Sequence, residues 1–153
     1  MNAKHKIWYI IAYIFKEIVL FSIGGFIYVL IEYFWRGYSH PTMFIVGGLC
    51  FAIIGLLNEL FTESMSLLIQ SIIGSVIVTI IELISGYIIN IRLGLNVWDY
   101  SELPLNIMGQ VCLPFALLWV ILSAVSVVVD DLCREHIFLE PHVTYHIFPR
   151  KNK

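Results

Sequence analysis

The chain has 153 residues, of which 59% are hydrophobic and only 13% are charged, and its mean hydropathy is +0.88. Soluble domains carry about 25% charged residues, and a soluble fold of this size could not bury so much apolar surface, so we predict an integral membrane protein built of helices. The formal net charge of −2 and the lack of a basic stripe argue against a nucleic-acid partner.

The N-terminal segment carries Lys4 and Lys6 ahead of a long apolar run, as a signal peptide would. No cleavage site of small residues follows, so we expect the segment to be retained. One helix across the whole run would bury the charges of Lys16 and Glu17, at a cost of about 2.5–3.5 kcal/mol for each. We therefore predict that residues 1–16 form a cytoplasmic, interfacial helix and that the first span follows it.

Four apolar stretches come next, and each has the length of a membrane span. A helix of about 19 residues is about 28 Å long, which matches the hydrocarbon core of a bilayer. The predicted fold is all-α, with a transmembrane helical domain over residues 17–129 and a short cytoplasmic tail over residues 130–153. The four predicted spans cover residues 17–35, 43–60, 66–91 and 105–129.

Small and polar residues recur along single faces of these spans, which favours close helix packing in lipid. The second span carries Gly48, Ala52, Gly55 and Glu59 on one face, and the fourth carries Gly109, Ala116 and Ser123. The third span has a polar stripe, which we expect to face protein or water rather than lipid. This stripe consists of Ser71, Ser75, Thr79, Glu82 and Gly86.

The basic residues fall unevenly on the two sides of such a bundle. Four spans place both termini on one side, together with Lys4, Lys6, Lys16, Arg134, Arg150, Lys151 and Lys153. The other side holds Arg36 and Arg92. The positive-inside rule then predicts a cell-membrane protein with both termini in the cytoplasm and two polar loops on the outer face.

The two outer loops and the polar residues inside the spans are the candidate site residues. The loops contribute Tyr38, Ser39, His40, Trp98, Asp99, Tyr100 and Ser101. The spans contribute Glu32, Glu59, Glu82, Asn106 and Gln110. Aromatic rings can stack on a ligand and Asp99 can accept hydrogen bonds, but an interfacial turn with aromatic belt residues explains the second loop equally well.

Two kinds of chemistry remain open at these residues. His40, Asp99 and Glu82 are the types that hold a metal or relay a proton, although their spacing matches no metal motif. We expect no metal and no other cofactor, and the three separate cysteines, Cys50, Cys112 and Cys133, are expected to be free thiols. Glu82 is the strongest functional candidate, because it lies far from both ends of its span; hydrogen bonding between helices is the structural alternative.

The loops and small-residue motifs also carry a resemblance to a known family. The motifs are Tyr38-Ser39-His40-Pro41, Gly47-Gly48, Asn58-Glu59, Trp98-Asp99-Tyr100-Ser101, Asn106, Gly109-Gln110 and Cys112. In this order, over about residues 35–119, the chain resembles the bacterial family of putative ABC-transporter type IV membrane proteins. The resemblance implies a permease. No GxxxxGK[ST] loop is present, so any ATP-driven activity would need a separate ATPase.

The expected function is therefore that of a membrane component of a transport system for a small solute. The expected partners are the lipid bilayer, an ATPase or another membrane subunit, and a second copy of the chain. One alternative is a scaffold or assembly factor whose outer loops bind an envelope protein. The other is an intramembrane enzyme, against which stands the lack of any nucleophile and base at a recognised spacing.

Overall fold

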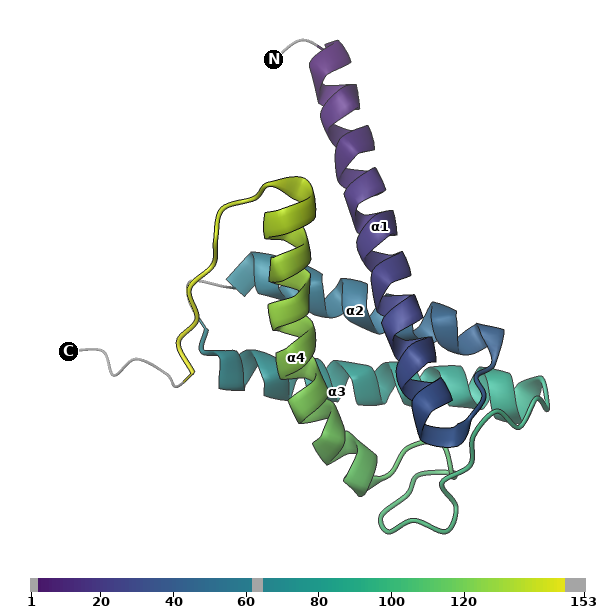
Figure 1. Cartoon of the computed structure of the whole chain (residues 1–153). Coiled ribbons are helices and arrows are strands. Elements are labelled where there is room, and N and C mark those ends of the chain that lie inside the picture. Colours follow the sequence, from purple (N-terminus) through teal and green to yellow (C-terminus); the bar gives the residue numbers. More distant parts are fainter. Residues whose placement is uncertain (1–2, 62–64, 148–153) are drawn as a thin grey trace.

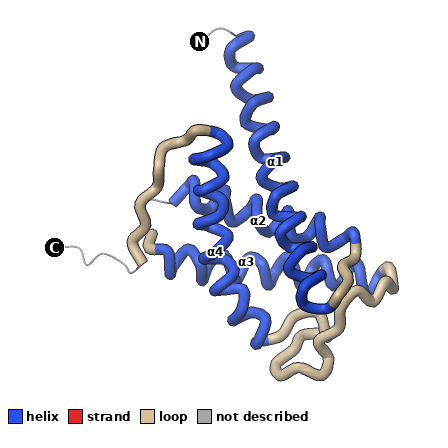
Figure 2. Tube along the Cα trace, viewed as in Figure 1, coloured by secondary structure: helices blue, strands red, loops and turns tan. Residues whose placement is uncertain are grey.

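The computed structural model describes residues 3–61 and 65–147, and within these residues the fold consists of helices joined by loops (Figures 1 and 2). The all-α prediction is confirmed. The helices are α1 (Ala3–Arg36), α2 (Pro41–Phe61), α3 (Leu67–Gly86) with the π-helix η1 (Tyr87–Arg92) at its end, and α4 (Leu113–Phe138).

The helices associate as two hairpins, since α1 packs chiefly on α2 and α4 packs chiefly on α3. Glycines allow α1 and α2 to lie close together, as the sequence predicted for the second span. A Cβ atom on Gly47 would lie 2.3 Å from Tyr28 Cβ, and one on Gly24 would lie 2.2 Å from Phe51 Cβ. Such distances leave room for a hydrogen atom only, so at these positions the backbone of one helix packs directly against an aromatic side chain of the other.

The N-terminal helix differs from the prediction, because α1 runs without a break through residues 16 and 17 (Figure 1). The sequence argument treated Lys16 and Glu17 as unpaired charges. In the fold, Lys16 Nζ lies 2.6 Å from Glu140 Oε1, and Glu17 Oε1 lies 3.4 Å from Arg134 Nη2. Because both charges meet opposite charges, the helix need not end between them. The first half of α1 projects beyond the rest of the described chain (Figure 1).

Three helices have the length and apolar composition of a membrane span: Lys4–Arg36, Leu67–Arg92 and Leu113–Phe138. The apolar part of α2, Pro41–Leu57, is shorter. The prediction of four spans behind an interfacial helix is therefore wrong. The predicted interfacial segment belongs to the first long helix, and the second predicted span is a short apolar helix that packs against it.

The fourth span begins later than predicted. Residues 105–112 form a loop in which Ile107 and Val111 pair as an isolated antiparallel bridge, and Leu113 is the first helical residue. Gly109 has a φ of +70°, which glycine adopts without strain, and Pro114 opens the helix. Asn106, Gly109 and Gln110 are therefore loop residues, and the predicted seam of Gly109 with Ala116 and Ser123 does not form.

The end of the chain is more structured than a tail starting at residue 130 would be. Helix α4 continues through Asp130 and Arg134 to Phe138, and Leu139 ends it in a left-handed conformation with a φ of 58°. The segment after it then returns to the start of α3, where the amide of Leu67 donates to the carbonyl of His146 at 2.8 Å. This segment caps α3 and closes one end of the fold.

Candidate functional site

Glu82 lies at the centre of the fold. The predicted polar stripe of α3 faces inward: Ser71, Ser75, Glu82 and Gly86 are all buried. Glu82 is 6% exposed, and each of its oxygens accepts a hydrogen bond from an aromatic side chain. Trp119 Nε1 of α4 lies 2.9 Å from Oε2, and the Tyr100 hydroxyl of the outer loop lies 3.2 Å from Oε1. Both donors are neutral, so neither brings a positive charge to the carboxyl group.

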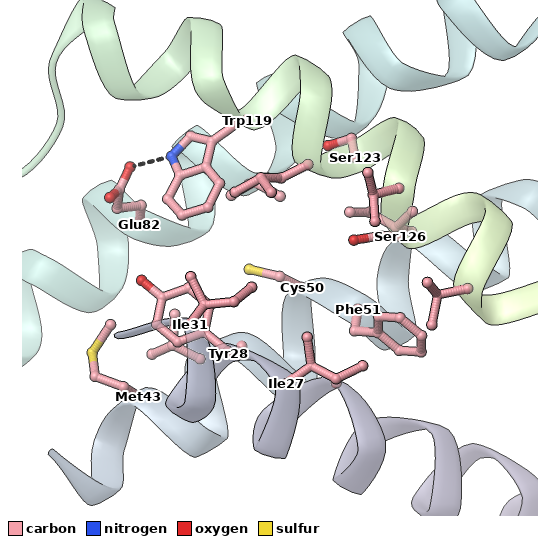
Figure 3. Close-up of a pocket in the computed structure, with 18 of the residues that line it drawn as sticks. Ile27, Tyr28, Ile31, Met43, Cys50, Phe51, Glu82, Trp119, Ser123 and Ser126 are labelled. Atoms are coloured by element: carbon pink, nitrogen blue, oxygen red, sulfur yellow. Dashed lines mark hydrogen bonds between the residues drawn. The ribbon is translucent and has the colours of Figure 1, made fainter. Parts of the chain in front are cut away.

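A partly open cavity of about 90 Å³ lies beside Glu82 (Figure 3). All four α-helices contribute to its wall, and most of the lining is apolar. Among the described residues that line it, Glu82 is the only Asp, Glu, Lys, Arg or His. Figure 3 shows the Cys50 thiol pointing into the space and the Tyr28 hydroxyl pointing towards the side where Glu82 lies. A carboxylate is thus held against an apolar space with aromatic walls.

Two aromatic pairs define the walls of this site. The rings of Tyr28 and Trp119 are stacked with their centroids 6.2 Å apart, so α1 and α4 meet across the cavity. Tyr100 stacks on Phe115 with centroids 4.6 Å apart. Burial, followed by the negative charge of Glu82, raises the pKa of the Tyr100 hydroxyl well above its usual value. Tyr100 therefore remains a proton donor towards Glu82 at any physiological pH.

A wider groove adjoins the cavity on the side between α1 and α4. Its volume is about 800 Å³, and it opens at the surface. The groove and the cavity share Tyr28, Ile31, Met43, Trp98, Trp119 and Leu122, so they are separated only by these side chains. The residues that line the groove but not the cavity include Phe34 and Trp35 from α1 and Phe115 and Leu118 from α4. Nearly all of this wall is aromatic or aliphatic.

The outer loop is held over the site by Asn90, which lies in η1. The Asn90 side chain donates to the Trp98 carbonyl at 3.0 Å and to Gln110 Oε1 at 2.8 Å, and it accepts from the amide of Val97 at 2.7 Å. A π-helix shifts the helical register by one residue, and such turns are often found at functional sites. In this protein the π-helix places the buried side-chain amide of Asn90 between two segments of the loop, residues 97–98 and Gln110.

Trp98 and Gln110 form the floor of this loop. Trp98 is 8% exposed, and its indole donates to the Gln110 carbonyl at 3.0 Å, so it is a buried wall of the site rather than an interfacial belt residue. Gln110 is 5% exposed. The sequence predicts Gln110 inside a membrane span, whereas in the structure Gln110 is a buried loop residue beside Gly86 of α3.

The remaining residues of this loop form a turn. Asp99 Oδ1 accepts hydrogen bonds from the Ser101 amide at 2.9 Å and from the Ser101 hydroxyl at 2.5 Å. These hydrogen bonds keep the pKa of the Asp99 carboxyl below its usual value. The Asn106 side chain donates to the carbonyls of Ser101 and Leu103. Asp99, Ser101 and Asn106 are therefore joined to one another by the hydrogen bonds of this turn.

The first outer loop is held by an ion pair at the end of α1. Arg36 pairs with Glu32, and Ser39 donates a hydrogen bond to the same carboxylate. Arg36 also donates to the Val97 carbonyl at 2.9 Å, and its guanidinium lies 4.7 Å from the centre of the Tyr38 ring. This arrangement ties the two outer loops together through α1.

The structure does not gather His40, Asp99 and Glu82 into one site. His40 Nδ1 lies 2.8 Å from Thr42 Oγ1 in the first turn of α2, Asp99 belongs to its own turn, and Glu82 contacts aromatic donors. Within residues 3–61 and 65–147, no three His, Cys, Asp or Glu side chains are grouped as a metal site requires. The three cysteines are free.

A second cluster of charges lies at the opposite end of the bundle, around Arg134. The side chain of Arg134 is 2% exposed, and its Nε lies 2.6 Å from Oδ2 of Asp130, which is fully buried. Glu17 of α1 and Glu59 of α2 lie 3.4 Å and 3.6 Å from the same guanidinium. Glu59, predicted only as a polar residue near the end of its span, is thus part of a network that joins three helices.

Sequence reasoning missed several residues that build the site. Trp119 lies in a continuous apolar run, where one more aromatic residue carries no signal. Asn90 near the end of a predicted span was a detectable signal, because a polar amide in an apolar segment needs partners. Tyr28, on the inner face of α1, has no distinguishing spacing either.

Comparison with known proteins identifies one family. A family model described as Putative ABC-transporter type IV matches residues 19–149, which is most of the chain and includes Glu82, Trp119 and Arg134. No curated protein and no solved structure matches the chain.

Proposed function

The chain belongs to the Putative ABC-transporter type IV family, and from this premise we propose that it is the membrane component of a transport system for a small solute. The observation that carries the proposal is Glu82, a buried carboxyl group with no basic residue opposite it among the described residues that line its cavity. Such a group is costly in a membrane protein, and intramembrane carboxylates of this kind mark substrate or proton pathways.

The proposal includes a separate ATPase subunit, because the chain has no phosphate-binding loop of its own. A cavity of about 90 Å³ is also narrow for a solute path through one copy. A second copy or another membrane subunit therefore completes the pathway in this proposal. The exposed apolar surface of α1, which includes Trp8 and Tyr9 at 70% exposure each, is available to lipid or to such a subunit.

Affinity purification of the tagged full-length protein from native membranes in a mild detergent tests this function. Recovery of an ATPase subunit supports transport. Recovery of an envelope protein without an ATPase contradicts transport and supports the scaffold function, and recovery of no partner also contradicts an ATP-driven system. A Glu82→Gln variant, purified in parallel, should retain the partner, since glutamine keeps the shape of the side chain.

We propose that the protein acts without catalytic chemistry of its own. The candidate acids and bases each have a structural partner: His40 contacts Thr42, Asp99 contacts Ser101, and Glu82 contacts Trp119 and Tyr100. Two of these pairs join a hydroxyl group to a base, but within the described residues neither His40 nor Asp99 has a third side chain that orients it, as activation of a nucleophile requires.

The proposed orientation in the cell membrane has both termini in the cytoplasm and both loops outside. It rests on the excess of lysine and arginine on the side of the termini. The ion pair of Lys16 with Glu140 brings the two terminal segments to one end of the fold and Arg36 brings the two loops together at the other, with the shorter helix α2 running back between these ends to Arg134. Single cysteines at Ser39 and Ser101, in a background without Cys50, Cys112 and Cys133, should react with an impermeant maleimide in intact cells. Reaction only after lysis would reverse the orientation.

A further inference from the structure

We propose that the cavity beside Glu82 and the groove between α1 and α4 together bind one single-chain amphiphile, with a primary ammonium head at Glu82 and an apolar tail in the groove. This proposal rests on the proposed function in one respect, because it names the class of solute that would be transported. Binding of that solute can be measured without transport.

The charge of the head follows from the surroundings of Glu82. Among the described residues that line the cavity, no cation faces this carboxylate, and its two hydrogen bonds come from neutral groups. Each carboxylate oxygen accepts two hydrogen bonds, so each retains one place for a ligand donor. A primary ammonium supplies three N–H donors and the opposite charge, and the aromatic faces of Trp119 and Tyr28 add cation–π attraction.

The size of the cavity limits the head. A cavity of about 150 Å³ holds a benzene molecule, and this cavity has about 90 Å³. A primary ammonium with its first carbon atoms fits that volume, whereas a trimethylammonium group crowds it. An alkyl ammonium has a pKa near that of lysine, about 10.4, so the head is charged at neutral pH.

The apolar tail of the ligand is inferred from the volume and the lining of the groove. Only the six side chains that line both spaces separate the cavity from the groove, so a rearrangement of these side chains lets one molecule occupy both. The groove volume of about 800 Å³ lies within the usual range for ligand sites, about 300–1,000 Å³. Its two charged residues, Glu32 and Arg36, already pair with each other, which leaves an apolar surface for an alkyl chain.

The test is binding of radiolabelled decylamine to the full-length protein in phosphatidylcholine nanodiscs, with empty nanodiscs as background. Unlabelled decylamine should displace the probe, while decyltrimethylammonium and 1-decanol should each be on the order of tenfold weaker as competitors, because one is too large and the other lacks charge. Equal competition by 1-decanol would show that the groove holds any apolar chain, lipid or detergent included, and would overturn the ammonium site.

Three variants separate head from tail. Glu82→Gln should lower decylamine affinity on the order of tenfold and leave 1-decanol affinity unchanged. Leu118→Trp, inside the groove, should weaken both ligands, and Leu117→Trp, a neighbouring exposed position that lines neither space, is the matched control. Equal effects of the two tryptophans, or full decylamine affinity in folded Glu82→Gln protein, would refute the site. Either result leaves the ATPase purification unaffected, so the two proposals fail separately.

Discussion

Replacement of Arg134 by methionine is expected to lower the free energy of unfolding by about 3–5 kcal/mol, because it leaves a buried carboxylate without its cation. Methionine preserves most of the apolar volume of the side chain. Asp130 is fully buried and its Oδ2 lies 2.6 Å from Arg134 Nε, so it bears most of the loss. Glu59 is 41% exposed and lies 3.6 Å away, so solvent screens it and its share is small.

A second substitution identifies the origin of this loss. Asp130→Asn in the Arg134→Met background removes the unpaired charge and should restore most of the stability, since a neutral pair of similar volume often replaces a buried ion pair at little cost. Lys16→Met is the control for a more exposed pair. Its partner Glu140 is 30% exposed, so the change should cost less than about 1 kcal/mol.

Reversible unfolding in mixed micelles, with SDS as the denaturant and circular dichroism as the signal, measures these differences. An Arg134→Met protein within about 1 kcal/mol of the wild type would refute the reasoning, because a fully buried Asp130 charge cannot be left unpaired so cheaply. A large loss that Asp130→Asn does not reverse would assign the effect to packing instead of charge.

Three further predictions concern packing, the loop and pH. Gly47→Ala should lower the free energy of unfolding by about 1–3 kcal/mol, because the added Cβ would lie 2.3 Å from Tyr28 Cβ. Ile45→Ala, at an exposed position of the same helix, should leave the free energy of unfolding unchanged. Asn90→Ala should speed hydrogen exchange over residues 97–110, since three hydrogen bonds are lost; unchanged exchange would contradict its role. Glu135, 2.8 Å from His142, raises the pKa of that histidine above 6.5, so this contact stabilises the C-terminal segment while Glu135 is ionised and His142 is protonated. The stabilisation fades as pH rises through the raised pKa of His142 or falls through the lowered pKa of Glu135. An NMR titration of His142 should show a lower midpoint in Glu135→Gln.

The sequence predicted the helical class and the inward face of α3 because both depend on local information. A long segment of apolar residues is stable in few environments other than a membrane. Polar residues that recur with the helical period lie on one face of their helix, and that face is buried. Ser71, Ser75 and Glu82 are buried for that reason. The free cysteines were predicted on the same kind of evidence.

The boundaries could not be predicted, because they depend on partners that are distant along the chain. Lys16 and Glu17 end a span only if nothing neutralises them, and their partners are Glu140 and Arg134 at the other end of the sequence. Asn106 and Gln110 were placed in a span because the sequence does not reveal that residues 105–112 turn back on themselves around Gly109. The contacts that build the site, from Trp119 and Tyr100 to Glu82, have separations of the same kind.

The two charge clusters and the cavity between them indicate which wall of the bundle opens most easily. Arg36 joins α1 to the loop before α4, and Arg134 joins α4 to α1, so opening either end breaks a hydrogen bond of a charged group that is worth about 1.5–3 kcal/mol. The ion pair of Arg134 with Glu59 of α2 would be lost as well. Between these two ends, the contact of α1 with α4 is short and consists of apolar side chains. Separating α1 from α4 exposes apolar surface. In a bilayer this surface contacts lipid instead of water, so the separation costs little free energy. The cheapest route to Glu82 is therefore sideways from the membrane, which is the direction in which the groove lies.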